Sequence, residues 1–193
     1  HGVLRAQGLL LTSWQKLNAA GKQLSRDETL GLMDQCLELF KQLGDYAAQH
    51  EGNPIDPQPH EKLNQAFKDW ENGTNTQPEG SNGKAPVIGI TAPGGIHQST
   101  PENHVTYAGK NLDQVAQQHL HQTAGQHYTL NTGKSISLFA HDEGLKAIAH
   151  HGPLLLQSQH DDTVVNAEQN VNITASQGEI RAMADKEIVW MTS

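Results

Sequence analysis

The stretch "AGKNLDQVAQQHLHQTAGQHYTLNTGKSISLF", residues 108–139, decides the fold because it repeats itself every eight residues. Written as four octads from residue 108, it reads Ala, Ala, Ala, Thr at the first position and Gly, Gln, Gly, Gly at the second. The fifth position is Leu, Leu, Tyr, Ile. A repeat this short is typical of a solenoid or β-helix and not of a globular sheet. Each octad is expected to supply one short strand and one turn, with small residues where the chain bends or approaches a neighbour closely.

The composition indicates how such strands could be buried. Only 35% of the 193 residues are hydrophobic, whereas soluble domains typically have roughly 45–50% apolar residues. One or two inward side chains per octad cannot give a single chain a sufficient core. Several intertwined chains would cover one another's strand edges around a thin shared core. The sequence therefore predicts a mainly β, obligately oligomeric protein.

The chain divides by composition into four predicted segments. These are a short β segment (1–11), a helical segment (12–73), a Gly/Pro/Asn linker (74–86) and the octad-repeat β-helix (87–193). The repeat drifts after Ala140, where "HDEGLKAIAHHGPLL" (141–155) is expected to be a bend or a less regular run. Within the helical segment we expect a helix at about 26–50, preceded by the capping pair Ser25 and Glu28, a shorter one near 13–20, and one within 61–73.

Two apolar stripes with helical spacing run along 26–50. The first stripe is Leu30, Met33, Leu37, Phe40, Gly44 and Ala47; the second stripe is Leu32, Cys36, Leu39, Leu43 and Tyr46. Together they form a wide apolar face that needs a partner. Trp14, Leu17, Phe67 and Trp70 could pack on this helix as a small satellite core. Alternatively, part of the face could dock a cargo or adaptor.

Charge and cysteine content exclude several classes of protein. The net charge of −8 and the absence of a dense Lys/Arg cluster argue against nucleic-acid or membrane-surface binding. No apolar run is long enough to span a membrane. The single cysteine, Cys36, excludes an internal disulfide and is expected to be a buried, inert thiol.

The candidate chemistry is weak, and we predict no catalytic, cofactor-binding or metal-binding residues. Eight of the twelve histidines lie within 104–160: His104, His119, His121, His127, His141, His150, His151 and His160. Metal-like spacings are His119 with His121, His150 with His151, and His141-Asp142-Glu143, but no zinc pattern exists and solvated histidines are expected. Ser158, His160 and Asp161 are merely adjacent in sequence, which is not triad geometry. Glu143, Asp161 and Asp162 lack a calcium-loop pattern. The glycine-rich stretch "TAPGG" (91–95) is expected to be a turn. The charged run "ADKE" (184–187) is expected to be a solvated surface.

The chain resembles the C-terminal part of the VgrG family, the trimeric spikes of bacterial type VI secretion systems. The resemblance lies in residues 4–15, 19–28, 85–140 and 152–176, including "LRAQGLLLTSWQ" and "APVIGITAPGGIHQSTPENHVTYAGK". It implies a homotrimeric, intertwined triple-stranded β-helix (β-prism), similar to the needle of contractile phage tails. It also implies a base, absent here, that sits on stacked hexameric tube rings, a PAAR-type tip protein, and effectors that are fused to the spike or docked on it.

Three functions follow in order of preference. The first is a structural one, a rigid trimeric needle that carries or displays a tip protein and effectors. It would be held in the bacterial cytoplasm before firing, then be secreted or injected, and would pierce the target membrane mechanically. The alternative is an effector- or adaptor-binding module that uses the helical segment 12–73. An enzyme, such as a hydrolase dependent on His160, is the least favoured.

Overall fold

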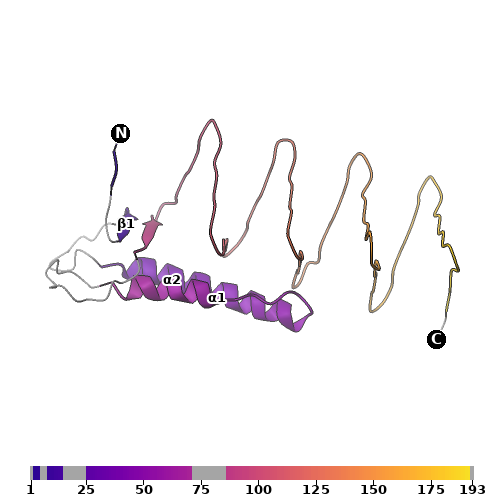
Figure 1. Cartoon of the computed structure of the whole chain (residues 1–193), viewed down its shortest axis with the longest axis horizontal. Coiled ribbons are helices and arrows are strands. Elements are labelled where there is room, and N and C mark those ends of the chain that lie inside the picture. The colour runs from indigo at the N-terminus through magenta and orange to yellow at the C-terminus, as the bar shows by residue number, and fades with distance from the viewer. Residues whose placement is uncertain (1, 5–7, 15–24, 71–85, 192–193) are drawn as a thin grey trace. The chain divides into compact units, whose positions relative to one another are not determined.

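The computed structural model describes residues 2–4, 8–14, 25–70 and 86–191. The chain divides into two units, His1–Leu145 and Lys146–Ser193, and each is described by itself. The elements of the first unit follow the order β1, α1, α2, β2 (Figure 1). Extended chain with regularly spaced bends follows β2.

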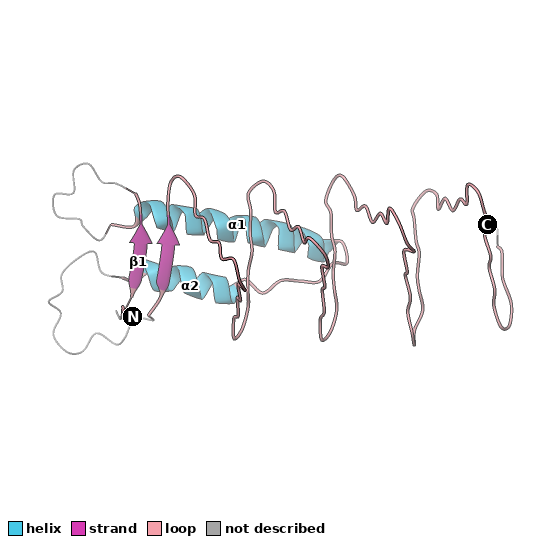
Figure 2. Ribbon diagram, turned by 90° about the horizontal axis from the view of Figure 1, so that it is seen from above, coloured by secondary structure: helices cyan, strands magenta, loops and turns pink. Residues whose placement is uncertain are grey.

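A small parallel sheet joins two distant parts of the sequence. β1 (Leu9–Thr12) pairs with β2 (Ile88–Thr91), with Leu9 opposite Ile88 and Thr12 opposite Thr91 (Figure 2). One further hydrogen bond extends the ladder at each end. The Leu9 N–H donates to the Val87 carbonyl at 3.0 Å, and the Ser13 N–H donates to the Thr91 carbonyl at 3.3 Å. Parallel strands need a long crossover connection, and the helices lie within it.

Two helices form the crossover. α1 (Asp27–Gln49) confirms the helix predicted at 26–50, but its N-cap is Arg26 and not the predicted Ser25. α2 (Gln58–Lys68) begins earlier than the predicted 61–73 helix, because Pro59 occupies its first turn, where a proline costs no hydrogen bond. The short helix predicted near 13–20 falls almost wholly outside the described residues, as do the linker 74–86 and Leu17.

The two predicted stripes of α1 face two different partners. The first stripe faces α2 and the loop before it: Asn64 Nδ2 donates to the Met33 carbonyl at 3.1 Å, and the Phe40 and His60 rings lie 5.8 Å apart. A Cβ on Gly44 would overlap Ile55, so glycine is required by the close approach of this loop. The second stripe faces the extended chain, where Tyr46 lies 6.2 Å from the ring of Phe139.

The predicted satellite core takes a different form from the one expected. Phe67 is the only buried hydrophobic residue among those described, with 3% exposure, and it lies against Gly89 of β2. Trp70 packs on Phe67 and on Gly8, where an added Cβ would come within 2.5 Å of the indole. Trp14 is exposed. The aromatic residues of the α2 region therefore pack on the small sheet, and the two glycines make room for them.

The octads are visible as bends at regular intervals. Bends begin at residues 101, 109, 117, 125, 133 and 141, spaced by eight, and then at 150, 159, 168, 176 and 185. After Ala140 the repeat is therefore mostly nine residues long, which explains why rows of eight drift there. Of the two expectations for 141–155, a bend or a less regular run, the structure shows bends at 141–143 and 150–152. The predicted turn at 91–95 is confirmed, with Gly95 at φ +113°.

Within the single chain, the described residues after β2 form no β-ladder. Over the described residues 92–191 no backbone hydrogen bond joins one part of the chain to another. Large apolar side chains there are exposed, including Leu120 (60%), Leu138 (68%) and Ile148 (85%). Holding a backbone in one conformation costs roughly 1–2 kcal/mol per residue. Neither hydrogen bonds nor apolar burial within the single chain offset that cost.

Candidate functional site

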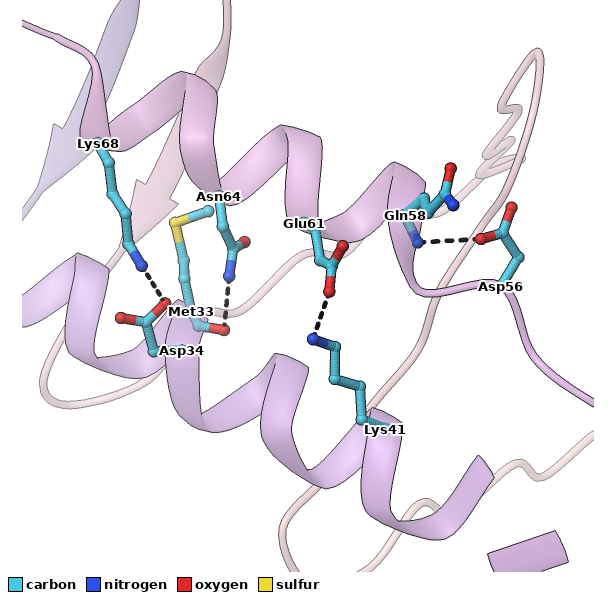
Figure 3. Close-up of polar contacts among 8 residues, drawn as sticks. All are labelled: Met33, Asp34, Lys41, Asp56, Gln58, Glu61, Asn64 and Lys68. Atoms are coloured by element: carbon cyan, nitrogen blue, oxygen red, sulfur yellow. Dashed lines mark hydrogen bonds and ion pairs between the residues drawn. The ribbon is translucent and has the colours of Figure 1, made fainter. Parts of the chain in front are cut away.

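The helical hairpin and the octad face beside it form the candidate site. Polar contacts fix α2 along α1: Lys68 Nζ lies 2.8 Å from Asp34 Oδ1, and Lys41 pairs with Glu61 (Figure 3). The hydrogen bond that Lys41 donates to the Glu61 carboxylate raises the pKa of Lys41, which keeps this amine charged. Asp56 accepts a hydrogen bond from the Gln58 N–H at 3.1 Å and so caps the start of α2. The hairpin is thus a preformed unit.

Arg26 holds the end of α2 against the start of α1. Its guanidinium donates to the carbonyls of Phe67 (2.7 Å) and Lys68 (3.0 Å) and to that of Trp70. These carbonyls lie at the C-terminal end of α2, where the helix leaves carbonyl groups without intrahelical partners and favours a positive charge. Arg26 is 4% exposed. Sequence patterns do not point to Arg26, because a single arginine before a helix forms no recognisable motif.

The loop after α1 is bonded to the octads. Asn53 N–H donates to Ser137 Oγ at 3.1 Å, and Asn53 Nδ2 donates to Ser135 Oγ at 2.9 Å. Tyr46 packs on His141, with ring centroids 4.1 Å apart, and His50 stacks on Phe139 at 6.0 Å. Within the first unit, the helices therefore fold against the octads and do not stand clear of them.

These contacts assign an inner and an outer face to the octads. Ser135, Ser137 and Phe139 are alternate residues that contact the hairpin, so Ile136 and Leu138 between them point the other way. Inner positions of successive octads meet one another: Gln122 Nε2 lies 3.5 Å from Gln114 Oε1, and the Tyr128 hydroxyl donates to Gln122 Oε1 at 2.7 Å. The inner faces of these three consecutive octads therefore face one another.

The contacts between hairpin and extended chain recur every three octads. Gly89 lies under Phe67, Asp113 is close enough to Cys36 to affect its titration, and Ser137 is bonded to Asn53. These three residues are spaced by 24 and share the same octad position. Cys36 is partly buried, and not fully buried as predicted. This partial burial raises the pKa of the Cys36 thiol, and the Asp113 carboxylate raises it further. Every third octad therefore returns to the hairpin, as expected if one turn of the chain has three faces.

The predicted metal spacings do not assemble a site. The His119 and His121 rings are 5.7 Å apart and those of His150 and His151 4.1 Å, while His141 Nδ1 lies 3.7 Å from Asp142 Oδ1. In the described part of the chain no three His, Cys, Asp or Glu residues are grouped to hold an ion. That no residue binds a metal or cofactor remains a prediction.

Ser158 and its neighbours form a turn. The Asp161 N–H donates to Ser158 Oγ at 3.3 Å, next to the bend at 159–161. The hydroxyl thus accepts from its own backbone, as short side chains do in local turns. The ADKE run likewise contains the bend at 185–186 and is exposed, as predicted.

Comparison with known proteins agrees with this geometry. Residues 75–193 match a family described as an uncharacterized protein conserved in bacteria (DUF2345), and residues 1–47 match a family described as the type VI secretion system Rhs element Vgr. Over 92% and 91% of its length, the chain is 39% and 38% identical to the type VI secretion system spike proteins VgrG2b and VgrG2a of Pseudomonas aeruginosa. It spans 18% and 21% of those two proteins.

Two solved structures share the fold. They are the VgrG spike from the type 6 secretion system (TM-score 0.87) and the Tle1 effector bound to that spike (TM-score 0.88). Each is 22% identical to this chain and is matched over the whole of it, across 69% and 56% of their own lengths respectively. No helix among the described residues is long and apolar enough to cross a membrane. The chain belongs to the VgrG family of type VI secretion spike proteins, and its residues 75–193 belong to the DUF2345 family.

Proposed function

We propose that this chain forms one third of an intertwined triple-stranded β-helix, the rigid shaft of a type VI secretion spike. The advance of the chain along α1 is the observation that carries the proposal. Phe67, whose carbonyl is bonded to Arg26, lies against Gly89. Further along α1, the Asp113 carboxylate is near enough to affect the Cys36 thiol, and Tyr46 packs on Phe139. These three levels correspond to Arg26, Cys36 and Tyr46 along α1. Ten residues of α-helix separate successive levels, which is about 15 Å.

That advance leaves room for two other strands. Neighbouring strands lie about 4.7–4.9 Å apart, so three spacings are about 14–15 Å. One turn of this chain, three octads long, therefore advances by three strand spacings. A solenoid made of one chain would advance by one spacing per turn and bond to itself, whereas the described residues 92–191 have no such bonds. Two further copies would fill the two vacant levels and pair with every exposed edge.

The octad glycines support the same assembly. Gly109, Gly125 and Gly133 lie at bends but have no left-handed backbone conformation that would require glycine. An added Cβ would meet nothing within the single chain. Neither conformation nor packing within one chain accounts for these residues, whereas close approach of a neighbouring chain does.

Hydrogen exchange tests the proposal residue by residue. In the assembled trimer we expect slow exchange for backbone amides across 103–140, since partner chains would bond groups that have no bond within the chain. Amides at the bends would exchange faster. Uniformly fast exchange of this segment in the native protein would contradict the intertwined β-helix.

In the spike, the shaft would transmit force and carry a load. We propose that a base domain joins it to the tube rings, that a PAAR-type protein covers its tip, and that it moves from the cytoplasm into target cells on firing. In a bacterium with an active secretion system, Leu120→Asp should prevent delivery of the full-length protein by placing charge on the inner face. Normal delivery of that variant would oppose the structural role.

Effector carriage is a second proposed role, supported by the solved spike with Tle1 bound. Both apolar stripes of α1 face the rest of the chain, so the helical segment 12–73 offers cargo its outer face, with the exposed Glu38 and Asp45. Reversing both charges (Glu38→Lys with Asp45→Lys) should weaken cargo capture while leaving the assembly intact. Unchanged capture would place the docking surface elsewhere. We propose no enzymatic activity for this chain, since neither His160 nor Ser158 belongs to a grouping of catalytic residues.

A further inference from the structure

The second stripe of α1 has more apolar surface than its own chain covers. Leu43 is 51% exposed and Leu32 48% exposed, although both lie on the face turned to the octads. Two residues of the same stripe lie at the levels of the chain's own strands. Tyr46 packs on Phe139 and His141, and Cys36 is near enough to Asp113 for the carboxylate to affect its thiol. The exposed leucines thus lie between the levels that the single chain occupies.

The spacing of the stripe matches the spacing of strands from different copies. One strand spacing corresponds to about three residues of α-helix. If Cys36 and Tyr46 lie over strands of their own chain, Leu39 and Leu43 lie at the levels of the two strands between. On this basis, which rests on the proposed trimer, we infer that the second stripe of α1 is an intersubunit surface that packs on strands of both other copies.

Symmetry identifies the partner segments. In the proposed trimer, each octad carries the chain to the next of three faces. The other two copies are rotated by one third and two thirds of a turn. On any one face, the octad of one copy is therefore followed by the next octad of a second copy and then by the octad after that of the third. Between the octads of Asp113 and Ser137, the two other copies would present the segments around His121 and Thr129. Leu39 would then lie on residues 119–123 of one partner subunit, and Leu43 on residues 127–131 of the other.

The outer positions of those segments are compatible with a helix above them. They alternate as His119, His121 and Thr123 in one octad and as His127, Thr129 and Asn131 in the next. These amphipathic side chains can offer apolar carbons to a leucine while their polar atoms reach the edge of the contact. The inference also gives the paired histidines a role in packing beneath a neighbouring helix, away from the axis.

Cross-linking distinguishes contacts between copies from contacts within one copy. In a Cys36→Ser background of the full chain, Leu43→Cys with Thr129→Cys, and separately Leu39→Cys with His121→Cys, are treated with a short bismaleimide. Both pairs should give covalent dimers and trimers on a denaturing gel. The matched control, Asn53→Cys with Ser137→Cys, joins residues of one chain that are 3.1 Å apart at their bonded atoms, and should remain at the 21.0 kDa position.

Light scattering on the same samples separates the two levels of the proposal. If the native mass corresponds to three chains but both test pairs cross-link only within one chain or not at all, the intersubunit role of α1 is wrong and the trimeric spike stands. If the native mass of the Cys36→Ser background and of the unmodified protein corresponds to one chain, the proposed function fails, and this inference fails with it.

Discussion

Replacing Leu43 by alanine should destabilise the protein far more if a neighbouring copy covers this side chain than if it is exposed as in the single chain. In the single chain Leu43 is 51% exposed. Burying a whole leucine side chain contributes roughly 1.5–3 kcal/mol, so a half-exposed one should contribute about 1 kcal/mol. If strands of another copy cover it, Leu43→Ala should instead cost about 2–5 kcal/mol per chain, the range for leucines removed from a core. Three such sites per assembly would make the loss easy to measure.

Urea denaturation at one fixed protein concentration measures this difference, because the stability of an assembly depends on concentration. Glu38→Ala is the control, since Glu38 lies on the outer face of α1 and is exposed; we expect a change within about 0.5 kcal/mol. Leu43→Met should cost less than about 1.5 kcal/mol, because it conserves volume. A loss of about 1 kcal/mol or less for Leu43→Ala, in a sample shown to contain three chains, would refute the reasoning.

Three further changes test the hairpin. Arg26→Ala should lower the free energy of unfolding by about 3 kcal/mol in urea denaturation, because it removes a buried guanidinium from three carbonyls. Arg26→Lys should recover only part of this loss. An alanine variant as stable as the parent would show that the Arg26 hydrogen bonds do not stabilise the hairpin. Gly44→Ala should lower the free energy of unfolding by about 1–3 kcal/mol, because the added methyl overpacks against Ile55. Ile55→Ala in the same chain should relieve much of that loss. If the two losses simply add, Gly44 and Ile55 are not in contact. The raised pKa of Cys36 disfavours its thiolate, so alkylation by iodoacetamide should become fast only above the pH at which an unfolded thiol reacts. Asp113→Asn should lower that pH and Asp45→Asn should not; identical pH profiles would mean that Asp113 is not beside Cys36.

The sequence predicted the elements better than their contacts. The helical spacing of both α1 stripes and the period of eight are local patterns, and each is visible in the structure. Which stripe faces α2 and which faces the octads depends on the path of the loop through Asn53 and Ile55, and local periodicity does not contain that path. Arg26 could not have been found for the same reason, since its partners lie more than 40 residues away.

The change of period after Ala140 begins where two glycines adopt a left-handed backbone. Gly144 and Gly152 have φ of +78° and +82° and lie in the first two repeats of nine residues. These conformations favour glycine, so the glycines after the bends at 141 and 150 were the available signal. The recurrence of hairpin contacts every 24 residues could not be predicted, because a period of eight does not indicate which octads lie on the same face.

Absolute mass in solution tests the central claim most directly. Multi-angle light scattering is preferred over elution volume, because its result does not depend on shape. The room for two further strands in each turn predicts a mass of about 63 kDa, three times the 21.0 kDa of one chain. A folded protein with the mass of one chain would contradict the account, since the levels between successive turns would then have no strands to fill them.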